Sequence, residues 1–285
     1  MSATDIDAEA PTGNTFAGDV FVNFRRWNRK VVRSPTAFVV EIVVGALSLL
    51  LFATVFGDVG EIALERAGFT GVDYVTYLLP AVLLQATIGS SFNSGMGLVG
   101  DLESGMFEKT VASPMSWTAV LAGKSASELL RIVVQVLVVL GFGVAAGATV
   151  RTGLAGVVGV VGICLLVAGL FVSIANAIGV VTGDEEVVNA ATMLFMFPLL
   201  FLSPAFIPMT DGVETLATFN PVTYGVDAIR ALVLGEDVMT VLEVTRFGGI
   251  YDTLVPAVGV LVALNLISGT IAVSLLARAS SASAT

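Results

Sequence analysis

Residues 152–183 read TGLAGVVGVVGICLLVAGLFVSIANAIGVVTG, a stretch without one charged side chain. A helix crosses the roughly 30 Å hydrocarbon core of a bilayer with about 20 apolar residues. Lipid offers no partner to a backbone N–H or C=O group, so a run of this length is expected to be helical. Membrane β-barrels show alternating segments of about ten residues instead, and none is visible. The stretch predicts an integral membrane protein built from helices.

Charge is scarce along the whole chain. Hydrophobic residues make up 56% of the 285 positions and charged residues 13%, with a mean hydropathy of +0.94. A soluble domain carries about a quarter charged residues, and so much apolar surface does not fit inside one soluble core. Other runs without charge, or with Glu41 alone, predict an all-α fold with six transmembrane helices. We expect these spans at residues 37–56, 75–99, 126–148, 154–181, 187–207 and 254–277.

The basic residues predict the orientation of the spans, because cytoplasmic loops are enriched in Lys and Arg. Five of them precede the first span, and an even number of spans places four of the other eight on the same side. Both termini are therefore expected in the cytoplasm, in a multi-pass protein of the plasma membrane. The acidic, polar start speaks against a cleaved secretory signal. We expect a disordered acidic tail at 1–14, one transmembrane domain at 15–279 and a short tail at 280–285.

The net charge is −10, no histidine is present, and Cys164 is the single cysteine. Acidic residues in the loops of both sides favour a halophilic, haloarchaeal source, with compositional drift as the alternative. Ala122-Gly-Lys-Ser125 is not a phosphate-binding loop, because Thr118 stands where that loop needs its first glycine. One cysteine within a span forms no disulfide framework. We expect no catalytic residue, metal site or cofactor in this chain.

An amphipathic helix is predicted at residues 16–32. Its apolar side chains fall within about one quarter of a helical wheel, and its basic side chains take other faces. Such a helix suits the cytoplasmic membrane interface. Packing against the protein's own neighbours is the alternative, and both can hold. The apolar stripe consists of Phe16, Val20, Phe24, Trp27 and Val31.

The predicted second and third spans are joined by residues 100–117, which begin GDLESGMFEKTVASPM. Leu98 and Leu102 share one helical face by their i, i+4 spacing, and Pro114 is expected to end that short helix. A charged helix at the cytoplasmic surface is a suitable docking element for a soluble partner. A simple connector is the alternative.

A second informative region follows the fifth predicted span, with LSPAFIP at 202–208 and FNPVTYGVDAIRALVLG at 219–235. Its first two prolines break the span, and Pro221 can begin a new helix at the first turn. Asp227 and Arg230 have the i, i+3 spacing of an ion pair. We predict that residues 208–252 turn at the outer surface and re-enter the membrane, where surrounding protein can satisfy irregular backbone. This segment would act as a lid or gate; an ordinary external loop is the alternative.

Polar residues within the predicted spans are costly in lipid. Glu41 lies about one turn inside the interface, where it can snorkel or pair with Arg33, and we favour a structural role for it. Five amide side chains either line a path or join helices: Gln85, Asn93, Gln135, Asn176 and Asn265.

The regions at 100–124 and 202–235 resemble the type-2 ABC transporter permeases, six-span exporter subunits, in their drug-export-like branch. The first region matches at Glu103, Gly105, Glu108, Ser113-Pro114 and Gly123-Lys124, and departs at Asp101-Leu102, Met106 and Thr110-Val111. The second region matches at Ser203-Pro204, Pro208, Asn220-Pro221, Tyr224, Asp227, Arg230 and Leu234-Gly235. The amphipathic start resembles the family's interfacial helix, so the likeness covers essentially the whole chain.

The resemblance implies a coupling loop that docks on an ATPase subunit, and an outer gate. The coupling residues would be Asp101, Glu103, Gly105, Glu108 and Pro114. The gate residues would be Pro204, Pro208, Asn220, Pro221, Tyr224, Asp227 and Arg230. Two ATPase copies would bind ATP and Mg²⁺, and the permease would pair with itself or with a related chain. The lipid bilayer would be a further partner, and nucleic acid would not.

We therefore expect a non-catalytic exporter permease that moves an amphipathic, lipid-like or drug-like molecule outward. A polysaccharide- or lipid-exporting permease is one alternative. An ATP-independent carrier or channel is another, although it predicts inverted repeats and paired intramembrane charges that the sequence does not show. A membrane-embedded enzyme would need a catalytic cluster, and a scaffold stays open.

Overall fold

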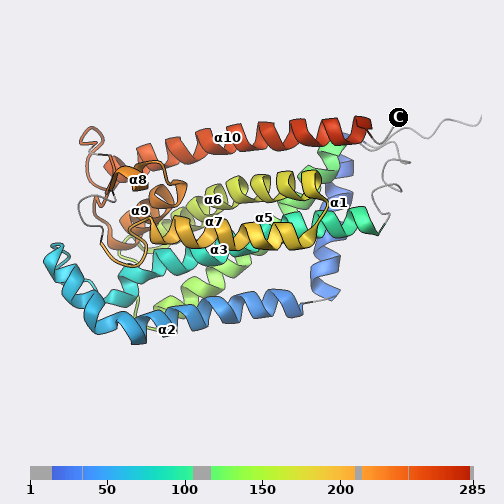
Figure 1. Ribbon diagram of the computed structural model, residues 1–285. Coiled ribbons are helices and arrows are strands. Elements are labelled where there is room, and N and C mark those ends of the chain that lie inside the picture. The colour runs from blue at the N-terminus through green and yellow to red at the C-terminus, as the bar shows by residue number, and fades with distance from the viewer. Residues whose placement is uncertain (1–14, 34, 105–116, 209–213, 243, 283–285) are drawn as a thin grey trace, which may run out of the picture.

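The computed structural model describes residues 15–33, 35–104, 117–208, 214–242 and 244–282 (Figure 1). Over these residues the chain forms nine α-helices and no strand, which confirms the predicted all-α fold. The helices are α1 (Phe16–Arg33), α2 (Thr36–Arg66), α3 (Tyr74–Glu103), α5 (Trp117–Ala145), α6 (Gly153–Thr182), α7 (Glu185–Phe201), α8 (Glu214–Thr218), α9 (Pro221–Leu234) and α10 (Ile250–Ala282).

Among the described residues, five helices are long and apolar enough to cross a bilayer: α2, α3, α5, α6 and α10. Helix α7, which corresponds to the fifth predicted span, has 17 residues. At 1.5 Å per residue it measures about 25 Å, slightly less than the hydrocarbon core. The structure is that of a multi-pass helical membrane protein, and the total of six spans stays a prediction.

Several helix ends differ from the expected boundaries; α5, for example, begins at Trp117 instead of near residue 126. Helix α2 continues past residue 56 to Arg66, through Asp58 and Glu61, because a helix that leaves the hydrocarbon can carry charge without cost. Helix α7 ends at Phe201 instead of near residue 207. The reason is Pro204, whose ring clashes with a preceding helical turn and which supplies no backbone N–H.

Helix α3 lies at the centre of the bundle, packed against α2, α5, α6, α7 and α9. Within its most apolar stretch 78% of the residues are buried, against 11% for α2 and α10 at the edges. The approach of α3 to α6 is close at Gly95, where a Cβ atom would lie 2.4 Å from the carbonyl oxygen of Ala175. The central helix therefore contacts most of the other described helices.

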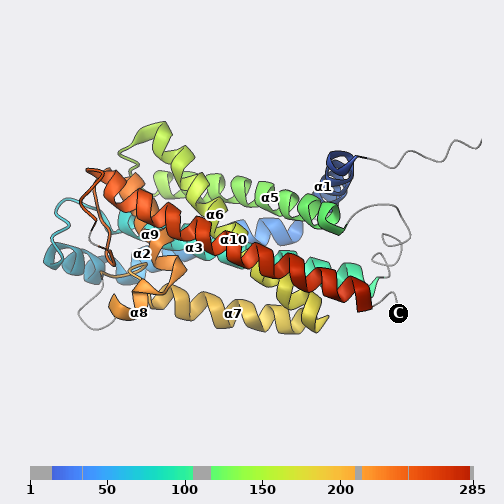
Figure 2. The same cartoon turned by 90° about the horizontal axis from the view of Figure 1, so that it is seen from above.

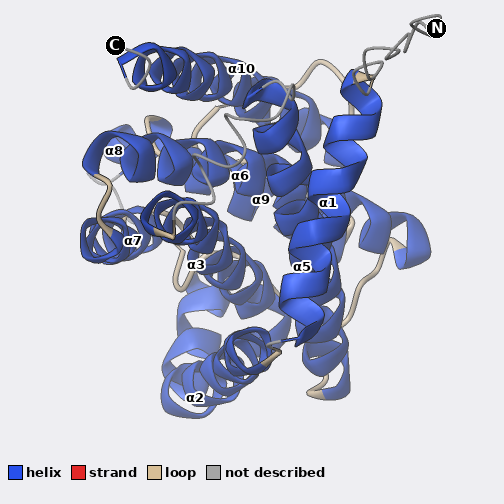
Figure 3. Cartoon of the chain, turned by 90° about the vertical axis from the view of Figure 1, so that its right-hand side faces the viewer, coloured by secondary structure: helices blue, strands red, loops and turns tan. Residues whose placement is uncertain are grey.

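The two ends of the bundle are built differently. Helix α1 runs across one end, nearly perpendicular to the long helices, and packs against α5 (Figure 3). Helices α8 and α9 lie at the opposite end (Figure 2). We call these the α1 end and the α9 end. The bounds of α1 agree with the amphipathic helix predicted at residues 16–32.

Candidate gate and coupling surface

Helix α9 is enclosed by its neighbours. Every residue from Val222 to Leu234 is buried, and the helix packs against α3, α6, α7 and α10. Its 14 residues correspond to about 21 Å, too short to cross roughly 30 Å of hydrocarbon. The structure thus places a short, buried helix between α7 and α10; the re-entry of this segment into the membrane stays a prediction.

Asn220 joins the end of α7 to the start of α9. Its Oδ1 atom accepts a hydrogen bond from the backbone N–H of Val222 at 2.9 Å, as an N-cap does. Its Nδ2 group donates to the carbonyl oxygens of Leu199 at 2.6 Å and Leu202 at 3.0 Å. The Leu199 carbonyl belongs to the last turn of α7, and the Leu202 carbonyl to the residue that follows the helix. At a helix end such carbonyls lack the N–H groups of a next turn. One side chain thus closes two helix ends, with Pro221 in the first position of α9.

Arg230 fastens α9 to the chain that leaves α7. Its Nη2 group donates to the carbonyl oxygen of Pro204 at 2.8 Å and to those of Tyr77 and Ala205 at 3.4 Å. The guanidinium carbon lies 3.7 Å from the centre of the Tyr77 ring, a cation–π contact. Only 1% of the side chain is exposed, so these carbonyl oxygens take the place of water as hydrogen-bond acceptors.

Asp227 is the buried counter-charge. Its Oδ1 atom lies 3.9 Å from Nη1 of Arg230, so the ion pair predicted from the i, i+3 spacing is present. Its Oδ2 atom accepts from the backbone N–H of Thr240 at 3.0 Å and from the Thr240 hydroxyl at 2.7 Å. The pair links α9 to the chain on either side of it.

Two tyrosines of α3 hold residues 203–208, which we call the 203–208 turn. The Tyr77 hydroxyl donates to the carbonyl oxygen of Pro204, and the Tyr74 hydroxyl to that of Phe206, both at 3.2 Å. The Tyr74 ring lies against α2 at Gly60, where a Cβ atom would be 2.3 Å from the ring. Only glycine allows this contact, so α2, α3 and the turn meet at one point.

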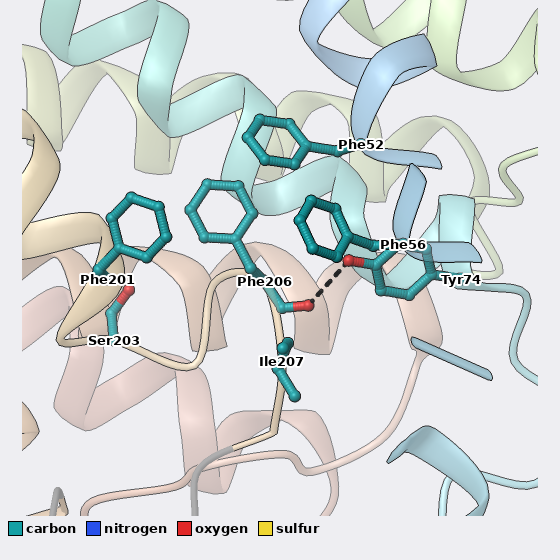
Figure 4. A pocket seen from close by; sticks show the side chains of 7 residues that line it. All are labelled: Phe52, Phe56, Tyr74, Phe201, Ser203, Phe206 and Ile207. Atoms are coloured by element: carbon teal, nitrogen blue, oxygen red, sulfur yellow. Dashed lines mark hydrogen bonds between the residues drawn. The ribbon is translucent and has the colours of Figure 1, made fainter. Parts of the chain in front are cut away.

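An aromatic pocket opens beside this turn (Figure 4). Its volume is about 150 Å³, the size of an apolar cavity that admits one benzene ring. The Phe206 ring lies between those of Phe52 and Phe201, with centroid distances of 4.8 and 5.2 Å. The pocket is lined by Phe52, Phe56, Tyr74, Phe201, Ser203, Phe206 and Ile207.

The structure brings most of the predicted gate residues together at the α9 end. The Tyr224 hydroxyl donates to the carbonyl oxygen of Thr218 at 2.8 Å, which fixes the approach to α9. Pro208 ends the 203–208 turn and is half-buried. Sequence reasoning missed Tyr74, Tyr77 and the phenylalanines of the pocket. The i, i+3 spacing of the two tyrosines at the start of α3 was the one available signal.

The α1 end carries the first of the predicted coupling residues. Asp101, in the last turn of α3, accepts from Nη2 of Arg26 at 2.7 Å and lies 3.9 Å from Nζ of Lys30. Asp101 therefore ties α3 to α1. Glu103, at the end of α3, is exposed. The other predicted coupling residues, Gly105, Glu108 and Pro114, lie outside the described residues.

Trp27 is the anchor of α1 on the bundle. Its buried ring lies 4.7 Å from Nζ of Lys124 and 4.6 Å from Nζ of Lys30. Next to it α5 presents Gly123, where a Cβ atom would lie 2.5 Å from the carbonyl oxygen of Val20. The predicted apolar stripe is thus turned largely toward the protein: Trp27 is buried, Val20, Phe24 and Val31 are half-buried, and Phe16 is exposed.

Glu41 takes part in a polar cluster between α2, α3 and α5. It accepts from Nδ2 of Asn93 at 2.6 Å and from the Ser90 hydroxyl at 2.9 Å. Its charged neighbour is Arg131, at 3.8 Å, which also pairs with Glu128 at 3.0 Å. The pairing with Arg33 suggested by the sequence is wrong, because Arg33 lies on the exposed side of α1 while Arg131 faces α2.

Three of the five intramembrane amides join helices. Asn93 bonds Glu41, Asn176 accepts from the Ser94 hydroxyl at 2.9 Å, and Asn265 donates to the carbonyl oxygen of Leu166 at 2.7 Å. Gln85 and Gln135 each keep a buried Oε1 atom without a hydrogen-bond partner in the described part of the chain. Within those same residues, no group of His, Cys, Asp or Glu is arranged to hold a metal ion.

Comparison with known proteins places this multi-pass helical protein among transporters. The profile of the ABC-2 type transporter family matches residues 19–234, from α1 to the end of α9. The chain belongs to this family and is a transport permease subunit. It is 29% identical over 205 residues to a daunorubicin resistance ABC transporter permease protein of Streptomyces coeruleorubidus, covering 70% of each chain. It is 26% identical over 222 residues to a proposed transport permease of Cyanophora paradoxa, covering 76% of this chain and 74% of the relative.

Proposed function

We propose that this chain is the membrane half of an ATP-binding-cassette exporter. It moves an amphipathic, lipid-like or drug-like molecule outward, while a separate ATPase subunit binds and hydrolyses Mg²⁺-ATP. Two permease chains assemble with two ATPase chains. The α1 end faces the cytoplasm, because it holds the basic residues of α1 together with Lys124 and Arg131, and cytoplasmic segments are rich in such residues.

One observation carries the proposal: α3 runs unbroken from Tyr74 to Glu103. Its 30 residues span about 45 Å. At the α1 end it bears Asp101, beside the predicted coupling loop, and at the α9 end it bears the two tyrosines that hold the 203–208 turn. A packed helix transmits displacement as a rigid body. A push on the coupling loop would therefore reach the turn and the aromatic pocket.

The chemistry of the pocket supports an amphipathic cargo with an aromatic or aliphatic part. Five of its seven lining residues are Phe or Tyr, and the Tyr74 hydroxyl is already engaged with Phe206. An apolar cavity of this kind favours a ring or a chain end over a charged group. The similarity to a permease named for daunorubicin resistance favours a drug-like molecule among such cargoes.

Affinity isolation of the intact protein in mild detergent tests the coupling, with mass spectrometry of the chains that accompany it. We expect an ATP-hydrolysing subunit to accompany the wild type and to be lost from the Glu103→Arg/Glu108→Arg variant. The matched control is Glu61→Arg/Glu65→Arg, which makes the same charge change on exposed residues of α2 at the α9 end. It should keep the subunit.

Isolation of the wild type without an ATPase, under conditions that preserve other membrane complexes, would reject the exporter proposal in favour of an ATP-independent carrier. Equal loss in both variants would reject the placement of the docking site. Transport in reconstituted vesicles that stops on removal of ATP is the complementary positive result.

A further inference from the structure

Helix α1 has a second face that no other part of the described chain covers. Phe21 and Val32 lie on it with 61% and 78% of their surface exposed. Arg25 and Arg29 lie between them and are also exposed. The positions 21, 25, 29 and 32 follow helical spacing, so their side chains form one stripe opposite buried Trp27.

The arginines of this face have no carboxylate partner among the described residues. Arg26 and Lys30, on the flank of α1, are bound to Asp101. Arg25, Arg29 and Arg33 form no ion pair within the part of the chain that the structure describes. They stand four residues apart, about one helical turn, and thus present a row of positive charge along the helix.

The same residues line two adjoining shallow hollows, of about 660 and 820 Å³. Phe21, Arg25, Arg29 and Arg33 contribute to both. Each hollow therefore combines an exposed aromatic ring with at least three guanidinium groups. That combination suits a ligand with an anionic group beside an apolar part.

The position of α1 decides what meets this face. The helix ends at Arg33, and α2 begins at Thr36. Three residues of chain span about 10 Å at most, so the end of α1 stays within that distance of the first span. Val39 and Val40, in the first turn of α2, are more than half exposed, as lipid-facing residues are. Since α1 lies across the bundle end (Figure 3), its free face would lie near the headgroups of a bilayer that α2 crosses.

We propose that the Phe21–Arg25–Arg29–Arg33 face of α1 binds the phosphate groups of anionic phospholipids in the adjacent leaflet. Guanidinium groups bind phosphate oxygens in a bidentate manner, and Phe21 and Val32 settle among the upper acyl carbons. An acidic protein surface is the rival ligand. The exposed phenylalanine and valines favour lipid, because an acidic protein face would leave them without an apolar partner.

Native mass spectrometry of the delipidated full-length protein tests the site, with phosphatidylglycerol and phosphatidylcholine of identical acyl chains as probes. We expect the wild type to prefer phosphatidylglycerol. Each arginine near an anionic surface contributes about a fivefold preference, so Arg25→Gln/Arg29→Gln should reduce it roughly 30-fold. The control Arg66→Gln/Arg246→Gln makes the same charge change on exposed residues of the α9 end and should leave the preference unchanged.

Two further variants separate the contributions. Phe21→Gln should weaken both lipids to a similar degree, because it removes apolar contact and no charge. Arg25→Lys/Arg29→Lys keeps the charge but loses the bidentate geometry, so it should lower the preference less than the glutamine variant does. It serves if the glutamine variant fails to fold. A preference unaltered in Arg25→Gln/Arg29→Gln would overturn the proposal and leave the face to an acidic protein. Displacement of phosphatidylglycerol by inorganic phosphate at equal concentration would overturn the assignment to lipid.

Discussion

The α9 end and the α1 end of the bundle are held together by different kinds of contact. At the α9 end, the contacts are hydrogen bonds from buried side chains to backbone carbonyls, supported by aromatic rings and one buried ion pair. At the α1 end, the buried Trp27 ring packs against Lys124, and ion pairs join side chains of different helices, several of them partly open to solvent.

This difference matters for motion. A hydrogen bond to a fixed carbonyl has one geometry, and a buried donor without its acceptor is costly. An ion pair at a surface is weakly directional, easily exchanged and screened by salt. The contacts of the α9 end therefore allow a few discrete arrangements, whereas the ion pairs of the α1 end can exchange among many. A gate needs a few discrete arrangements, and a docking surface needs contacts that exchange easily.

The largest effect is expected at Arg230, because its substitution removes the most buried contacts of the α9 end. Arg230→Met removes the bonds to the 203–208 turn and leaves Asp227 buried without its counter-charge. Loss of one partner from a buried pair costs about 3–5 kcal/mol. The free energy of unfolding in mixed detergent micelles measures this. As a control, Arg151→Met removes the exposed pair with Glu236 and should cost less than about 1 kcal/mol. A similar loss of unfolding free energy in both variants would show that the Arg230–Asp227 pair behaves as an exposed one.

Gly60 offers a sharper test of the contact between α2 and Tyr74. In Gly60→Ala the new methyl group meets the Tyr74 ring at 2.3 Å, so the ring or α2 must shift, at about 1–3 kcal/mol. Transport should fall further than stability, because Tyr74 holds the turn beside the pocket. Gly57→Ala lies one turn away in the same helix with nothing within 4 Å. It should be neutral or slightly stabilising, and equal defects at both glycines would contradict the proposed contact.

Asn220 tests whether one side chain serves two helix ends. Asn220→Ala should lower the free energy of unfolding by about 1–2 kcal/mol, through loss of the N-cap of α9 and the bonds to α7. Asn220→Asp keeps an acceptor for the Val222 N–H but cannot donate to Leu199 or Leu202. An aspartate as stable as wild type would mean that the bonds to α7 contribute nothing.

The smallest effect is expected for Arg26 and Asp101 at the α1 end. A double-mutant cycle with Arg26→Gln and Asp101→Asn should give a coupling of about 0.2–1 kcal/mol that shrinks as NaCl is raised. The cycle formed by Asp227→Asn and Arg230→Met should be larger and insensitive to salt, because that pair is buried. The comparison of the two ends fails if both cycles respond to salt alike.

Local pattern was sufficient for features that one helix decides alone. Uncharged runs predicted the long helices, the wheel of residues 16–32 predicted α1, and the spacing of Asp227 and Arg230 predicted their pair. Pro221 after Asn220 marked the start of α9. These succeed because capping, periodicity and i, i+3 contacts depend on neighbours in sequence.

Contacts between distant segments were beyond the sequence. Glu41 was expected to snorkel or to pair with nearby Arg33, whereas its charged partner is Arg131, ninety positions away, because α5 packs beside α2. The place of Tyr77 under Arg230 likewise depends on how α3 meets α9. The coupling residues beyond Glu103 stay a prediction, since the structure does not describe them.

The polarity of α3 also bears on how the protein is made. Its most apolar stretch has a mean hydropathy of 1.4, against 2.5 for α2 and 2.1 for α5. Ser90 and Asn93 bond Glu41 of α2, and the Ser90 carbonyl oxygen accepts from Arg131 of α5. These bonds form only where α3 packs against α2 and α5, so we expect the seating of α3 in the bilayer to be completed once α5, synthesised after it, packs beside it.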